Sequence, residues 1–168
     1  MKSARAPILL LILLYVGFVA LVWLTREQLP ERVASHFGKS GRADGWMSRD
    51  SHVRYMMTFG LVFPLVVPVI CYCVRYLPAS LINIPRRDYW LASERKTETT
   101  DYLFRHSLWL GCLAVCFVAG SHWMVVDANR SVPPRLSTSL LAFVAGGFIA
   151  GLACWIVVLL RRFLRVKQ

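Results

Sequence analysis

Four long stretches without a charged residue constrain this chain more than any other feature. They run from Ala6 to Thr25, from Tyr55 to Val74, from His106 to Val126 and from Leu136 to Leu160, and they contain 20, 20, 21 and 25 residues. A helix rises about 1.5 Å per residue, so each stretch is long enough to cross a hydrocarbon core of about 30 Å. The sequence therefore predicts an all-α protein with four membrane-spanning helices.

The composition places the chain in the membrane class, because 57% hydrophobic and 17% charged residues are too apolar a mixture for an ordinary soluble domain. We expect one membrane domain over residues 1–168. Its spans are expected at about 7–24, 55–76, 106–126 and 138–160. An irregular external loop (25–54) should join the first two spans, and a partly helical cytoplasmic loop (77–105) should follow the second.

The distribution of Lys and Arg predicts the orientation. With four spans, both termini lie on one side of the membrane, and placing them inside puts 12 basic residues in the cytoplasm and 8 outside. This is the direction that the positive-inside rule favours. The formal net charge of +11 then reflects membrane orientation and anionic lipid, and we expect lipid contacts but no nucleic-acid partner.

Local signals add detail to the two loops and the second span. Gly38, Gly41 and Gly45 mark the first loop as rich in turns. Pro64 and Pro68 should kink the second span, because each removes a hydrogen bond of the helix. Ser93 is expected to be the N-cap of a helix that runs on into the third span, with Glu94 in its first turn.

The fourth span carries small residues that allow close helix packing. Ala142, Gly146 and Ala150 lie on one stripe, and Gly147 and Gly151 form a GxxxG pair beside it. We expect this surface to contact another helix. Either another span of the same chain or a second copy or partner protein could supply that helix.

No nucleotide-binding, metalloprotease or serine-hydrolase motif is present, so the sequence predicts no catalytic residue and no cofactor. The apolar stretches also lack charged residues, which argues against an ion-coupled transporter. The predicted topology places His36, His52 and His122 on the external side. Their imidazoles could bind a metal, or His52 and His122 could bind water and lipid headgroups at the interface.

The segment LPERVASHFGKSGRADGW resembles the signature of a bacterial membrane domain of unknown function, numbered 1648, that occurs in SdpI-type toxin-immunity proteins. The resemblance includes nine positions: Leu29, Pro30, Val33, His36, Phe37, Gly41, Asp44, Gly45 and Trp46. The later segment NIPRRDYWLASERK is similar to a second motif of that family. It matches at Asn83, Pro85, Tyr89, Trp90, Leu91, Ala92, Glu94 and Arg95.

The resemblance implies a multi-pass protein of the bacterial inner membrane and, by analogy, an immunity or signalling role against a peptide. Our leading hypothesis is a non-enzymatic binding or sensing protein that acts through its external loop. His36, Asp44 and Trp46 are the candidate ligand-binding residues, because they offer an imidazole, a carboxylate and an indole within a turn-rich segment. The alternatives are an accessory subunit of a larger membrane complex and, third, a metal-dependent membrane enzyme.

Overall fold

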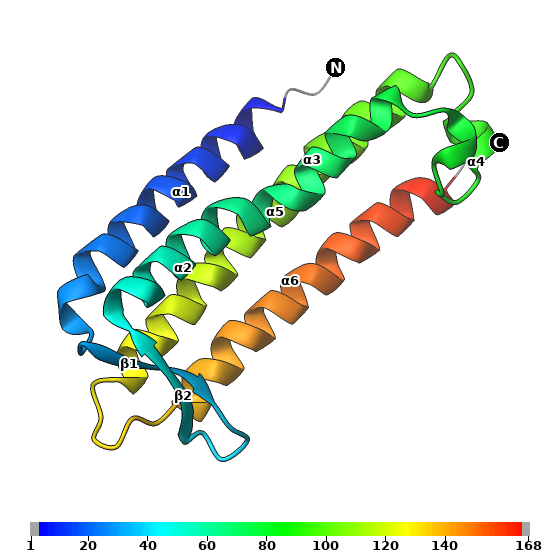
Figure 1. Ribbon diagram of the computed structural model, residues 1–168. Coiled ribbons are helices and arrows are strands. Elements are labelled where there is room, and N and C mark those ends of the chain that lie inside the picture. Colours follow the sequence, from blue (N-terminus) through cyan, green and yellow to red (C-terminus); the bar gives the residue numbers. More distant parts are fainter. Residues whose placement is uncertain (1–3, 166–168) are drawn as a thin grey trace.

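The computed structural model describes residues 4–165 and shows four long helical segments side by side in an elongated bundle (Figure 1). These segments are α1 (Arg5–Thr25), the interrupted run α2 (Arg49–Val62), η2 (Phe63–Leu65), α3 (Val66–Cys73) and η3 (Val74–Tyr76), then α5 (Lys96–Ala128) and α6 (Thr138–Leu164). Each of the four is long and apolar enough to cross a membrane. The predicted four-helix membrane architecture is confirmed.

The bundle has two different ends. A β-hairpin and the loop between α5 and α6 lie at one end, which we call the hairpin end (Figure 1). The starts of α1 and α5 and the end of α6 lie at the other, which we call the terminal end. Three short helices complete the fold: η1 (Arg26–Gln28), η4 (Ala79–Leu81) and α4 (Arg87–Trp90).

The second span is broken where its prolines predict a kink. Pro64 lies within η2, and a regular helix resumes at Val66. The bend packs against α5 at Gly111, where an added Cβ would lie 3.0 Å from the carbonyl oxygen of Pro64 and 3.4 Å from Cγ of Pro68. A glycine on α5 therefore makes room for the kinked backbone.

The start of α5 differs from the prediction. The helix begins at Lys96, and its N-cap residue, Arg95, makes no capping bond through its side chain. Ser93 is not the N-cap: its hydroxyl donates to the carboxylate of Glu94 at 3.0 Å. The helix begins two residues later than a cap at Ser93 would require. The predicted continuity from the loop into the third span is correct, since α5 runs unbroken for 33 residues.

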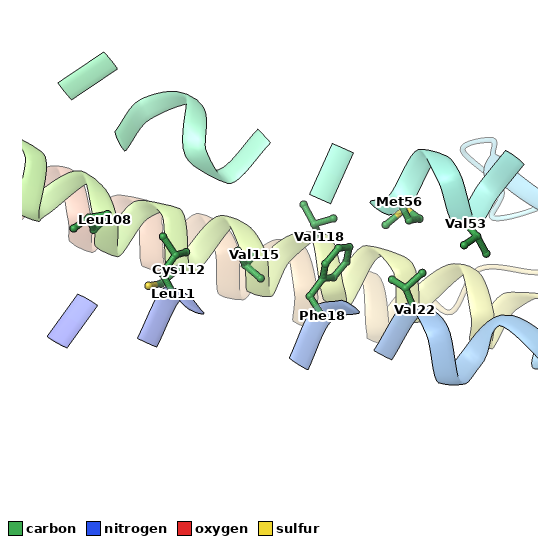
Figure 2. Close-up of a cluster of buried hydrophobic side chains, with 9 residues drawn as sticks. All are labelled: Leu11, Phe18, Val22, Val53, Met56, Leu108, Cys112, Val115 and Val118. Carbon is green, nitrogen blue, oxygen red and sulfur yellow. The ribbon is translucent and has the colours of Figure 1, made fainter. Parts of the chain in front are cut away.

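The buried core lies between α5, α1 and α2. Its side chains, shown in Figure 2, are Leu11, Phe18, Val22, Val53, Met56, Leu108, Cys112, Val115 and Val118. Gly60 of α2 faces the ring of Phe18 so closely that an added Cβ would lie 2.3 Å from Cζ. The absence of a side chain at Gly60 is what lets α1 and α2 approach around this ring.

The helix α6 lies on the other side of α5 and uses a different kind of contact. Val144 packs on Gly120, Phe148 packs on Phe117 with ring centroids 4.5 Å apart, and Gly151 packs on Leu113. Near the terminal end, the rings of Trp155 and His106 stack at 4.7 Å. Their backbone carbonyls are also engaged, since Trp155 Nε1 donates to His106 O at 2.9 Å and His106 Nε2 lies 3.1 Å from Trp155 O.

The small-residue stripe of α6 points elsewhere. Ala142, Gly146, Gly147 and Ala150 are exposed, and a Cβ added at Gly146 or Gly147 would meet nothing within 4 Å. Of the predicted packing residues, Gly151 alone lies against α5 in the part of the chain that the structure describes. The remaining stripe is left for lipid or for another polypeptide.

The loop between α1 and α2 is more regular than predicted. It forms an antiparallel hairpin of β1 (Arg32–Phe37) and β2 (Ala43–Ser48), with Val33 opposite Met47 and Ala34 opposite Trp46. The register shifts around His36, which pairs with Gly45. A Cβ at Gly45 would lie 2.8 Å from that of His36, so the glycine permits the irregular pairing.

Candidate functional site

The hairpin is attached to α5 through one side-chain amide. Oδ1 of Asn129 accepts a hydrogen bond from the backbone N–H of Ala34 at 2.9 Å, and its Nδ2 donates to the carbonyl of Ala34, also at 2.9 Å. Nδ2 also donates to Val125 O at 2.8 Å. The amide thus pairs with both backbone groups of a strand residue, as a neighbouring strand would, and fixes β1 against the end of α5.

Apolar and ionic contacts reinforce this attachment. Leu29, Val33 and Val126 form a fully buried cluster between the start of the hairpin and α5. At the base of the hairpin, Arg26 Nη2 donates to Asp50 Oδ1 and Arg49 Nη1 donates to Glu27 Oε2, both at 3.0 Å. The two crossed ion pairs join the end of α1 to the start of α2. The hairpin is therefore held against α5, and the ion pairs hold together the two chain segments that enter and leave it.

The tip of the hairpin docks on the loop between α5 and α6. Gly41 has a φ of +74°, a left-handed conformation that favours glycine, and its carbonyl accepts a hydrogen bond from Leu136 N at 2.9 Å. Arg42 and Arg135 are paired in an antiparallel bridge. The loop before α6 therefore pairs with the hairpin tip through a short stretch of backbone.

A buried polar cluster lies beneath the hairpin, where α1, α2 and α5 meet. Nε2 of His122 lies 2.8 Å from Oγ1 of Thr25, and Nδ1 of His122 lies 3.2 Å from Nε2 of His52. The two imidazole rings stack with centroids 5.3 Å apart. His122 is completely buried and His52 is 2% exposed, so neither side chain contacts water or lipid headgroups, as one interpretation of the sequence had suggested.

The hydrogen-bond partners indicate which atoms of this cluster donate and which accept. With the single hydroxyl hydrogen of Thr25 donated to Leu21 O, at 2.7 Å, Oγ1 accepts from His122 Nε2. In a neutral imidazole the other nitrogen is then an acceptor, and His52 Nε2 must donate to His122 Nδ1. The chain of donors therefore runs from α2 through α5 to the backbone of α1.

The predicted ligand-binding residues lie on the exposed side of the hairpin. His36 Nδ1 is 2.5 Å from Asp44 Oδ1, across the two strands, and the two side chains are 76% and 52% exposed. Trp46 is 46% exposed, and the guanidinium of Arg32 lies over its ring at 5.5 Å. The structure thus pairs His36 with Asp44 and places Trp46 beside Arg32.

The three histidines considered as metal ligands do not converge. His36 is on the exposed hairpin with Asp44, whereas His52 and His122 bind each other in the interior. Among residues 4–165, no group of three or more His, Cys, Asp or Glu side chains could hold a metal ion. The five cysteines, all within the described helices, are free thiols.

Comparison with known families finds one similarity, and it includes the hairpin. Residues 10–62, which include most of α1, the hairpin and α2, match the family described as a domain of unknown function (DUF1648). The chain is similar to this family over 53 of its 168 residues. Searches of curated proteins and of solved structures find no match to the chain.

The structure gives the DUF1648 motif two physical roles. Leu29 and Val33 are buried anchors, while Gly41 and Gly45 meet backbone demands at the tip and at the irregular pairing. His36, Asp44 and Trp46 are exposed instead. The conformation of the hairpin therefore does not depend on burial of these three side chains.

The second motif, in the loop at the terminal end, is largely built into the fold. Trp90 is buried and its Nε1 donates to Phe163 O of α6 at 3.0 Å. Arg95 Nε donates to Tyr89 O at 2.7 Å, and its guanidinium lies over the Tyr89 ring. The exposed Glu94 accepts hydrogen bonds from its own backbone N–H and from Ser93, which lower its pKa.

Of the other motif residues of this loop, Leu91 is buried, Ala92 is half-buried, and Asn83 and Pro85 are exposed. Nearby, a cavity of about 1250 Å³ opens between α1, α5 and α6, and its lining includes four arginines. Two of these form ion pairs across the cavity wall: Arg75 with Asp101 at 3.6 Å and Arg162 with Glu98 at 2.7 Å. The terminal end therefore combines a packed loop with a wide basic opening.

Proposed function

We propose that this protein is a non-enzymatic binding or sensing protein of the bacterial inner membrane, and that the hairpin of its DUF1648-like segment is the binding surface. One observation carries the proposal. The hairpin backbone is fixed against α5 by the amide of Asn129 and a buried apolar cluster, while His36, Asp44 and Trp46 are exposed. A preorganised backbone that presents an imidazole, a carboxylate and an indole lowers the entropic cost of binding a ligand.

The proposed orientation places the hairpin outside the cell and both termini in the cytoplasm. It is supported by the excess of Lys and Arg in the terminal segments and the second loop, 12 against 8. Reporter fusions inserted after Lys39, at the hairpin tip, and at the carboxyl terminus test it. Alkaline phosphatase should be active only at the tip, and activity at the carboxyl terminus would reverse the orientation.

The resemblance to SdpI-type immunity proteins favours a peptide as one class of ligand to search for. A photo-crosslinking amino acid at Trp46 should capture the ligand in living cells, and mass spectrometry should identify it. The variant His36→Ala should abolish capture without lowering the amount of protein in the membrane. Lys39→Ala, an exposed change in the same hairpin, is the matched control and should capture as the wild type does.

Loss of protein together with loss of capture in the His36 variant would mean that the hairpin is only structural. Undiminished capture in both variants would remove His36 from the binding surface.

A second candidate function is that of an accessory subunit in a larger membrane complex. It is favoured by the exposed stripe of Ala142, Gly146 and Ala150, which no helix of the described chain covers. Small residues are the ones that allow close approach of helices in lipid. Purification in mild detergent distinguishes the two functions, because a stoichiometric partner that is lost in Gly146→Leu would support the subunit.

A further inference from the structure

A pocket of about 470 Å³ lies between the hairpin and the loop before α6. Its lining consists of Arg42, Ala43, Trp46, Pro133, Pro134 and Arg135. The hydrogen bond from Leu136 N to Gly41 O, at 2.9 Å, holds the two walls together. A volume of this size lies within the range of about 300 to 1,000 Å³ that small-molecule sites occupy.

Two arginines belong to the lining of this pocket. Arg42 and Arg135 are direct partners in an antiparallel bridge, which brings their Cβ atoms to within about 5.5 Å. Like charges in this relation destabilise the pairing of two strands. The fold therefore holds two positively charged, exposed residues of the pocket lining next to one another.

The protein supplies no such anion among its described residues. The guanidinium groups of Arg42 and Arg135 form no ion pair or hydrogen bond within residues 4–165. Asp44 follows Arg42 by two positions in the chain, but its carboxylate is bound to His36. Arg32, which lies over the ring of Trp46, adds a third positive charge to the surroundings of the indole.

We propose that this pocket binds the phosphate group of a phosphate monoester. Each guanidinium offers a planar fork of N–H donors that matches phosphate oxygens in a bidentate manner. A phosphate monoester carries a charge of about −1.5 to −2 near neutral pH, which offsets both arginines, whereas one carboxylate would offset a single arginine. Trp46 and the two prolines give the organic part of the ligand an apolar wall.

Two kinds of ligand carry such a phosphate group: a soluble phosphate monoester, and the headgroup of phosphatidic acid in the adjacent leaflet. The proposal rests on the proposed function in one respect, since it takes the hairpin end to be the binding surface. The phosphate proposal and the proposed function can fail separately. Phosphate binding is measured on the purified protein, whereas the capture at Trp46 is measured in cells.

The test uses the full chain in nanodiscs of phosphatidylcholine. Glycerol 3-phosphate is titrated by calorimetry, with glycerol as the uncharged control. We expect the wild type to bind the phosphate, and Arg42→Gln/Arg135→Gln to lose about tenfold to hundredfold in affinity. Lys39→Gln removes one positive charge from the same hairpin tip and should bind as the wild type does.

A second arm replaces part of the phosphatidylcholine with phosphatidic acid and measures the midpoint of thermal unfolding. If phosphatidic acid raises the unfolding midpoint only when both arginines are present, and glycerol 3-phosphate does not bind, the site belongs to the lipid headgroup. If the glutamine variant does not fold, Arg42→Lys/Arg135→Lys keeps the charge and should still bind more weakly. Equal responses of wild type and arginine variants in both arms would overturn the proposal.

Discussion

The two sides of α5 are packed by different means. Towards α1 and α2 there is a continuous buried core, in which Val115 and Val118 are each 1% exposed (Figure 2). Towards α6 there is a single row of contacts, and Phe163 is the one buried residue of that helix. The first side depends on interior packing, whereas the second depends on a few fitted pairs. Substitutions on the two sides should therefore lower the stability of the protein by different amounts.

The largest effect is expected at the hairpin end of the core, in His122→Ala. This change removes a fully buried ring and leaves the N–H of His52 without an acceptor. The cavity and the unpaired donor together should destabilise the protein by about 3 kcal/mol or more. Thermal unfolding in detergent measures the change.

Ser121→Ala is the matched control for His122, because the Ser121 hydroxyl donates only to Phe117 O of its own helix. A similar loss of stability in both variants would show that the cluster contributes nothing beyond ordinary helix packing.

The next effect is expected in Gly60→Ala. The added Cβ would lie 2.3 Å from the Phe18 ring, so α1 and α2 must separate or the ring must move, at a cost of about 1 to 3 kcal/mol. Gly17→Ala on α1 adds the same atom with nothing within 4 Å and should be neutral or stabilising. Unfolding midpoints that fall equally in the two variants would contradict the close fit.

On the α6 side, Gly151→Ala should cost about 1 kcal/mol, because the added Cβ would lie 2.8 Å from the end of the Leu113 side chain, which must move. Gly147→Leu, four residues earlier, points into open space and should leave the unfolding midpoint of the isolated protein unchanged. A change in its size on gel filtration, without a change in stability, would show that the exposed face contacts a second polypeptide.

The smallest effect is expected in Trp90→Phe. The ring remains in place against Phe163, but the hydrogen bond to the Phe163 carbonyl is lost, which should cost about 1 kcal/mol. Trp109→Phe, an exposed change on α5, is the control. Hydrogen exchange at the end of α6 should increase in the first variant alone, and no local increase would contradict an anchoring role for Trp90.

The sequence predicts the four spans and the kink because both follow from local physics. Charges are excluded from the hydrocarbon core, and a proline removes a hydrogen bond wherever it lies. The hairpin is harder to predict. Its strands are short, and β2 begins Ala-Asp-Gly, which are poor strand formers. What stabilises it is the amide of Asn129, which lies 95 positions from Ala34 in sequence.

The histidine pair shows the same limit. Topology placed His36, His52 and His122 on one side of the membrane, but it could not show which of them meet. His52 and His122 are 70 positions apart and come together only because α2 packs on α5. The face of α6 that contacts α5 is hard to predict for a related reason. Only Gly151 belongs to the predicted small residues, whereas Val144, Phe148 and Trp155 share no common size with it.

The helix α5 also has a mechanical consequence. Its 33 residues form a rod of about 50 Å, well beyond the thickness of about 30 Å of a hydrocarbon core. Asn129, at one end, holds the hairpin, and Thr99, at the other, donates to Trp90 O in the second loop. A rigid rod turns a tilt of about 5° at one end into a displacement of about 4 Å at the other. The two loops are thus fixed to opposite ends of one lever that crosses the membrane.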